Sequence, residues 1–106
     1  MAWLILIVSG LLETLWAVAL KQSDGFSKPG WIAVFAVAAT LSLGGLMIAL
    51  KDLPVGTAYA VWTGIGTVGA ALVGVLVLSE PLTALRALGI ALIVGGIVVL
   101  RLAGVQ

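Results

Sequence analysis

Residues 3–21 read WLILIVSGLLETLWAVALK, and this run decides the fold class. From position 3 to position 20 the run is apolar apart from Ser9, Glu13 and Thr14. A single helix needs about 20 such residues to cross the hydrocarbon core of a bilayer. The run has no basic residues before it and carries a carboxylate, neither of which is typical of a cleaved signal peptide. It therefore predicts a membrane-spanning helix that stays in the protein.

Three further apolar runs follow the first, and short polar stretches rich in turn-forming residues separate them. Helices satisfy all their backbone hydrogen bonds internally, so apolar runs of this length in lipid are expected to be helical. The predicted fold class is an all-α membrane protein with a single four-helix transmembrane domain at residues 1–106. The expected transmembrane helices lie at about 3–21, 30–50, 55–79 and 84–101.

The composition excludes several classes of protein. Of the 106 residues, 63% are hydrophobic and 8% are charged, whereas a soluble domain has about 45–50% and 25%. The net charge of +1, with no basic stripe, argues against binding nucleic acid. The chain has no Cys and no His, which removes the usual zinc and haem ligands and two common nucleophiles. We expect no enzyme activity, no metal and no cofactor.

The basic residues are almost evenly divided between the two sides of the predicted bundle. Lys51 and Arg101 fall on the side of the termini, and Lys21, Lys28 and Arg86 fall on the other. Basic residues orient a membrane protein, so a bias this small would allow insertion in both orientations. The alternative is that the one extra basic residue, or the N-terminal amine, selects one orientation. Two oppositely inserted copies would form an antiparallel, dual-topology dimer and supply the symmetry that other transporters obtain from an inverted repeat.

Glu13 is the only charged side chain deep within any predicted span. Such a carboxylate costs a few kcal/mol or more in lipid and usually marks an ion or proton pathway. The alternative is a structural Glu bonded to a neighbouring helix, but no Lys, Arg or His is expected to be buried opposite it. The residue type and its depth therefore favour a binding site for protons and cations.

Aromatic and small residues share faces with this carboxylate or lie in neighbouring spans. Helical spacing places Gly10, Glu13 and Trp16 on one face of the first span, and it places Tyr59 and Trp62 on one stripe of the third with Gly66 and Gly69. Aromatic faces attract a cation by about 0.5–2 kcal/mol. Plain packing of the aromatic rings is an equally open alternative. Two carboxylates modestly favour a guanidinium ion, because its paired N–H donors fit carboxylate oxygens.

Other small and polar residues have weaker signals. Ser42 offers a hydroxyl on a face of the second span that also carries Ala38, Gly45 and Ala49, and a bond to its own helix backbone is the alternative to a ligand contact. Gly64 and Gly66 indicate a flexing point in the third span. Gly89 and Gly96 lie seven residues apart and indicate a dimer seam, with Ala91 and Gly95 forming a second candidate seam. Packing within one protomer is the alternative for all these glycines.

Two long motifs carry a family resemblance: GLLETLWAVALK at residues 10–21 and LPVGTAYAVWTGIG at residues 53–66. The chain resembles the small multidrug resistance transporters over essentially its whole length, and among them it looks most like the guanidinium exporter subtype. The resemblance implies a multi-pass protein of the bacterial plasma (inner) membrane that forms an antiparallel homodimer. It also implies proton-coupled export of guanidinium by alternating access.

Carried over by position, the resemblance makes Glu13 the shared site for proton and substrate. It makes the pocket lining Gly10, Trp16, Ser42, Tyr59 and Trp62. The expected partners are guanidinium or a substituted guanidinium, protons, membrane lipid and a second copy of the chain. The chain departs from the usual pattern at Thr14 and in the Ala- and Gly-rich second span, which leaves open export of alkylguanidinium or quaternary ammonium compounds. A passive dual-topology channel for small ions is the alternative from another class.

Overall fold

The computed structural model describes residues 1–103, and within that range the chain forms four α-helices and no strand. All four helices are long and apolar enough to cross a membrane. The expectation of an all-α chain with four spanning helices is therefore confirmed. The helices are α1 (Ala2–Gln22), α2 (Pro29–Ala49), α3 (Val55–Leu76) and α4 (Ala84–Leu102).

The last three helices each begin at a proline or at a residue whose side chain caps the helix. Pro29 is the first residue of α2, where its missing N–H costs nothing. Pro54 precedes α3 in an extended conformation. Thr83 caps α4, because its Oγ1 accepts a hydrogen bond from the Arg86 backbone N–H at 3.1 Å. Each start is thus fixed by a residue whose chemistry suits a helix N-terminus.

The end of α3 differs from the sequence expectation. The predicted third span reached residue 79, whereas α3 ends at Leu76. Leu78 donates its N–H to the Val73 carbonyl at 3.2 Å, which closes the helix, and Ser79 then adopts a left-handed φ of 59°. Pro81 follows and cannot continue a helix. Apolar character alone did not predict this turn, because residues 77 and 78 are as apolar as the helix before them.

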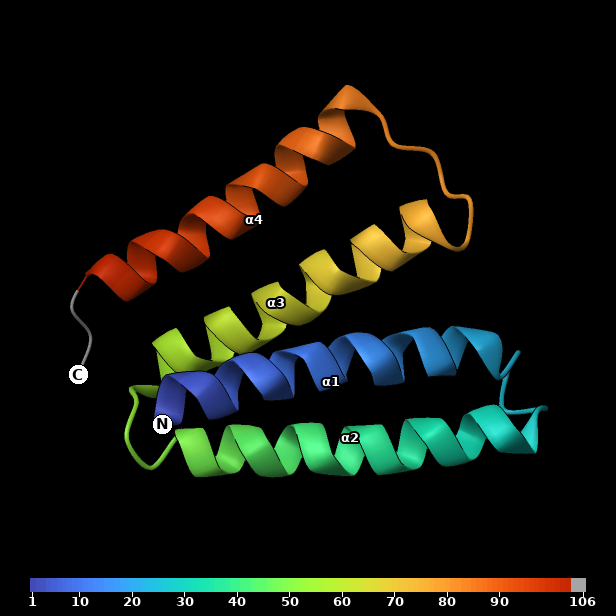
Figure 1. The fold of residues 1–106 in the computed structure, drawn as a ribbon, viewed down its shortest axis with the longest axis horizontal. Helices are drawn as coiled ribbons and strands as arrows, with labels where there is room; N and C mark the ends of the chain where they lie inside the picture. The colour runs from blue at the N-terminus through green and yellow to red at the C-terminus, as the bar shows by residue number, and fades with distance from the viewer. Residues whose placement is uncertain (104–106) are drawn as a thin grey trace.

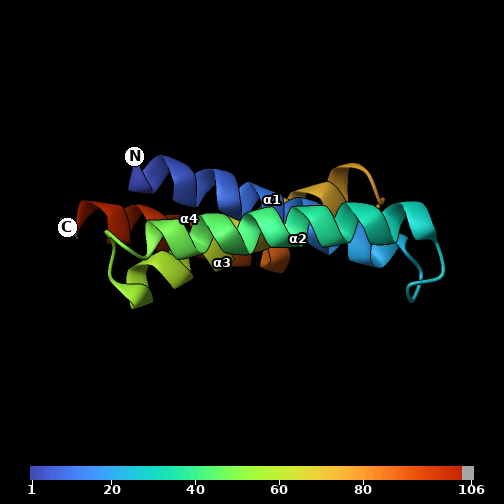
Figure 2. The same cartoon turned by 90° about the horizontal axis from the view of Figure 1, so that it is seen from below.

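The four helices form a flat layer in the order α4, α3, α1, α2, so α1 lies between α3 and α2 (Figures 1 and 2). The overall extents are 43 × 34 × 17 Å. Helix α1 packs against both α2 and α3, and α4 packs against α3 at the edge of the layer. The N-terminus of α1 and the end of α4 lie at the same end of the bundle. This arrangement places α1 where it can present side chains to two neighbours at once.

The hydrophobic core lies at one end of the bundle, where α1 begins, α2 ends and α3 begins (Figure 1). From that end, α3 and α4 diverge from α1 and α2. No residue of α4 is buried within the described chain. A single chain therefore leaves most of α4 to contact lipid or another molecule. The buried residues of the core are Leu6, Leu46, Ala49, Leu53, Ala58, Val61 and Trp62.

Candidate functional site

Glu13 lies in the middle of α1 and its carboxyl group rests against α3. The contact is to Gly66, where a Cβ atom would overlap Glu13 Oε1. That oxygen is buried and has no hydrogen-bond partner within residues 1–103. Over the same residues the one ion pair joins Arg86 to Glu80 at 3.2 Å. Arg86 lies in the first turn of α4, and Glu80 lies in the segment between α3 and α4. Glu13 thus presents an acceptor oxygen inside an apolar bundle, where an unpaired polar atom is costly and available to a ligand.

Ser42 links three helices through two hydrogen bonds. Its Oγ donates to the backbone carbonyl of Ser9 on α1 at 2.7 Å, and it accepts a bond from Trp62 Nε1 on α3 at 3.1 Å. Ser42 is fully buried and Trp62 is 5% exposed. The hydroxyl therefore does not bond to its own helix, which was the alternative from sequence. It fixes the orientation of the Trp62 indole instead.

Tyr59 lies one turn before Trp62, and the two rings are 5.8 Å apart at an interplanar angle of 38°. Tyr59 is 57% exposed, whereas Trp62 is buried. The pair forms a continuous aromatic surface that runs from the core to the outside of the chain. Such a surface provides π faces for a cation. Its exposed part, the Tyr59 ring, can contact lipid or another molecule.

Trp16 contacts α2. Its ring packs edge-on against Phe35, with 5.9 Å between centroids and an interplanar angle of 79°. Its Nε1 is buried without a hydrogen-bond partner in the described part of the chain. The sequence placed Gly10, Glu13 and Trp16 on one face, but because α1 lies between two helices, Gly10 and Glu13 face α3 while Trp16 contacts α2.

The remaining glycines of the predicted site have different environments. A Cβ at Gly10 would approach Ile65 Cβ to 2.8 Å, so Gly10 permits close packing of α1 on α3. A Cβ at Gly64 would meet Ile97 Cδ1 at 2.9 Å, so Gly64 packs on α4, and α3 continues as one helix through both Gly64 and Gly66. Gly89 and Gly96 have nothing within 4 Å of an added Cβ among the described residues. They lie on the open surface of α4, away from Glu13.

Sequence reasoning missed two groups in α1 that contact the other helices. Thr14 donates its Oγ1 hydrogen to the Gly66 carbonyl at 3.2 Å, and Ser9 supplies the carbonyl that Ser42 bonds. For Thr14 the signal was present as a polar residue within an apolar run, whereas the Ser9 group is a backbone carbonyl, which the sequence does not distinguish from any other. Their spacing could not show which neighbouring helix each would meet.

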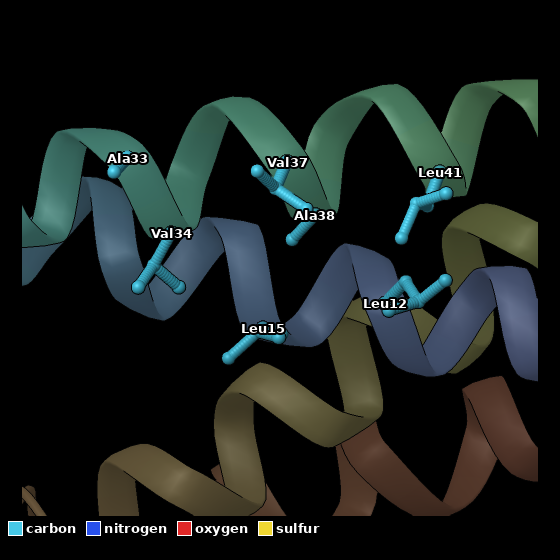
Figure 3. Close-up of a pocket in the computed structure, with 7 residues that line it drawn as sticks. All are labelled: Leu12, Leu15, Ala33, Val34, Val37, Ala38 and Leu41. Carbon is cyan, nitrogen blue, oxygen red and sulfur yellow. The ribbon is translucent and has the colours of Figure 1, made fainter.

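An apolar groove of about 370 Å³ lies between α1 and α2, and Figure 3 shows its lining side chains. All of them are aliphatic, so the groove offers no acceptor for a cation. It is not a candidate cation site, although it suits hydrocarbon. The lining residues are Leu12, Leu15, Ala33, Val34, Val37, Ala38 and Leu41.

Comparison with known proteins identifies the family. Residues 1–93 match the family model described as Small Multidrug Resistance protein. The chain belongs to the small multidrug resistance family. It is 51% identical over 105 residues to a guanidinium exporter of Yersinia pseudotuberculosis serotype I (strain IP32953), covering 97% of this chain and 99% of the relative. It is 52% identical over 104 residues to a guanidinium exporter of Escherichia coli (strain K12), covering 96% and 97%.

The family and the four spanning helices together define the class of protein. The relatives are named as exporters and come from bacteria, and this chain has four helices suited to crossing a membrane. It is therefore a multi-pass transport protein of the bacterial inner membrane, and the resemblance predicted from the two motifs is confirmed.

Proposed function

We propose that the protein is a proton-coupled antiporter that exports guanidinium ion by alternating access in an antiparallel homodimer. Glu13 is the shared binding site for the proton and the cation. The observation that carries this proposal is the Glu13 carboxyl group itself, which rests against Gly66 with Oε1 buried and without a hydrogen-bond partner among residues 1–103. A membrane carboxyl group with no permanent partner is suited to bind transient ones.

Guanidinium is the substrate that the chemistry and the relatives favour. The relatives named above are guanidinium exporters. A guanidinium ion offers paired N–H donors to carboxylate oxygens and a flat face to aromatic rings. Trp62, held by Ser42, and Tyr59 beside it supply such rings. Gly10 and Trp16 complete the proposed lining, with Gly10 keeping α1 close to α3.

A second copy of the chain completes the proposed site. Tyr59 is 57% exposed and α4 has no buried residue, so one chain does not enclose its own binding groups. Two copies would bring two Glu13 carboxyl groups to one cavity. The open face of α4 at Gly89 and Gly96 is the proposed seam, because glycines let helix backbones approach closely in lipid.

Exchange follows from competition at Glu13. The pair of carboxyl groups holds either protons or one guanidinium ion, and the loaded dimer then changes the side to which its cavity opens. Gly64 and Gly66 are the proposed flexing point of α3 during this change. Because proton and cation cannot occupy the carboxylates together, release of one on each side permits binding of the other. The proton gradient thereby drives export.

The substitution Glu13→Gln tests this proposal in liposomes that contain the purified protein. A pH indicator inside the liposomes reports proton flux when guanidinium is added outside. We expect the wild-type protein to show guanidinium-driven proton flux and Glu13→Gln to show none. Asp52→Asn is the matched control, because Asp52 is an exposed carboxylate in the α2–α3 turn and should leave the flux intact. Guanidinium-driven proton flux through Glu13→Gln would refute the proposal.

Two alternatives make different predictions in the same liposomes. An exporter of broader specificity would couple proton flux to alkylguanidinium or tetra-alkylammonium ions as well as to guanidinium. A passive channel would conduct ions without proton movement and would not need Glu13. The carboxyl group without a partner favours the exchanger over the channel.

A further inference from the structure

Thr14 uses its hydroxyl in an unusual way for a residue inside a helix. Ser and Thr hydroxyls in helices commonly donate to the carbonyl one turn earlier in the same helix. Ser9 and Thr40 do so, at 2.7 Å to Ile5 and 2.8 Å to Ala36. Thr14 instead donates across to the Gly66 carbonyl of α3 at 3.2 Å. It therefore links two helices, and the link is made at the glycine against which Glu13 rests.

The surroundings of Thr14 are shaped for this bond. A Cβ at Gly69 would overlap Thr14 Oγ1, so the side chain fits over Gly69 only because that residue has none. We call the hydrogen bond to Gly66 together with the seat on Gly69 the Thr14 clasp. Since Gly64 and Gly66 are the proposed flexing point of α3, the clasp holds α3 to α1 at the place where it is proposed to bend.

Symmetry decides what such a contact can do, and this step rests on the proposed function. In an antiparallel homodimer the two-fold axis lies in the membrane plane. The outward-open and inward-open states are then the same structure with the roles of the two protomers exchanged. A contact made in either protomer shape therefore occurs equally often in both states, and it cannot shift the equilibrium between them. It can only change the barrier.

We propose that the Thr14 clasp slows the conversion between the outward-open and inward-open states, and we call this effect the brake. The clasp opens while α3 flexes and closes again when the exchange of shapes is complete, so it sets the rate of alternation without setting guanidinium affinity. Thr14 is thus a positioning residue that acts through α3 and does not bind the cargo.

Thr14→Val tests the brake because it keeps the shape of the side chain and removes the donor. The Gly66 carbonyl keeps its partner within α3, so no polar atom is newly orphaned. Loss of one hydrogen bond in the resting state should speed alternation by about two- to tenfold. Gly69→Ala should also speed it, because the added methyl group displaces Thr14. Thr14→Ser keeps the hydroxyl and Thr40→Val removes a bond within α2 only, so both should stay near the wild-type rate.

The rate is measured by NMR exchange spectroscopy of the dimer in lipid bicelles, and the guanidinium Kd by quenching of Trp fluorescence. We expect Thr14→Val to raise the exchange rate while the Kd stays within about twofold of wild type. An unchanged rate, or a Kd that shifts in step with the rate, would overturn the brake while leaving the exchanger intact. If the wild-type protein instead gives one set of NMR signals and no exchange, the two protomers do not adopt different shapes. That result would contradict both the proposed alternating dimer and the brake.

Discussion

At the scale of single residues, a few polar groups organise an otherwise apolar chain. Ser42 is fully buried and both donates and accepts, so it satisfies the Trp62 indole and a carbonyl of α1 at once. Glu13 Oε1, by contrast, has no partner over residues 1–103. Ser42 thus joins three helices through its hydrogen bonds, whereas the buried Glu13 oxygen is left without one in the described part of the chain.

Ser42→Ala should lower the free energy of unfolding by about 1–3 kcal/mol, because it leaves Trp62 Nε1 buried without an acceptor. The measurement is unfolding in mixed micelles of increasing SDS content, followed by Trp fluorescence. Thr40→Val is the control, since Thr40 is exposed and bonds only to its own helix, and it should change stability by less than about 0.5 kcal/mol. Equal effects of the two substitutions would show that the Ser42 bonds do not matter for stability.

The position of Glu13 deep within a spanning helix could be expected from the sequence, but the contacts around it could not. A carboxylate within an apolar run is conspicuous whatever the tertiary fold. The partners of Ser42 and Thr14 depend on which face of α1 meets α2 and which meets α3. Trp16 illustrates the limit, because helical spacing grouped it with Glu13 although it packs against Phe35.

At the scale of elements, the close packing of α1 on α3 explains the glycines at two positions. Gly10 and Gly66 lie where α1 and α3 approach closely, and an added Cβ at either would meet atoms of the other helix. Gly44 in α2 has nothing within 4 Å of an added Cβ in the described chain. Glycine is therefore required for packing at some positions and dispensable at others.

Gly10→Ala should lower the free energy of unfolding by about 1–3 kcal/mol, because its methyl group would press on Ile65 and force α1 away from α3. Gly44→Ala is the matched control. It should be neutral or should stabilise the protein by up to about 1 kcal/mol through helix propensity. The SDS titration used for Ser42 measures both variants. A Gly10→Ala protein as stable as Gly44→Ala would contradict the close packing of α1 on α3.

Helix starts were easier to predict than helix ends and faces. The polar segments containing Pro29, Pro54 and Pro81 are recognisable from local chemistry alone. The end of α3 at Leu76 is not marked in the sequence, because the apolar run continues through residues 77 and 78 to the left-handed Ser79. Apolar residues nearly all around each helix also hide the buried face, since lipid accepts the same side chains as a protein core.

At the scale of the whole molecule, α4 is the helix with no buried residue within the described chain. Among residues 1–103, α4 packs against α3, and near its end the Arg101 guanidinium lies 5.1 Å from the centre of the Trp3 ring on α1. An added Cβ at any of its three glycines, Gly89, Gly95 and Gly96, would meet no atom within 4 Å in the described chain. In the proposed dimer this surface meets the second copy.

Gly96→Leu should prevent dimer formation while leaving the chain folded, because the added side chain would push apart the two copies of α4 at the proposed seam. Ala91→Leu places the same bulk on another face of α4 and should leave the dimer intact. Chemical crosslinking in liposomes, quantified by gel electrophoresis, distinguishes the two. A dimer lost in Ala91→Leu and kept in Gly96→Leu would move the seam to the face of Ala91 and Gly95.

The proposal that proton and cation share Glu13 is tested most directly by measuring proton release when guanidinium binds. Guanidinium is added to purified protein in weakly buffered detergent solution at a pH where Glu13 is protonated, and a pH electrode records the change. If one site holds either protons or the cation, wild-type protein releases protons in proportion to bound guanidinium, and Glu13→Gln releases none. Saturable guanidinium binding to the wild-type protein without any proton release would contradict the shared site.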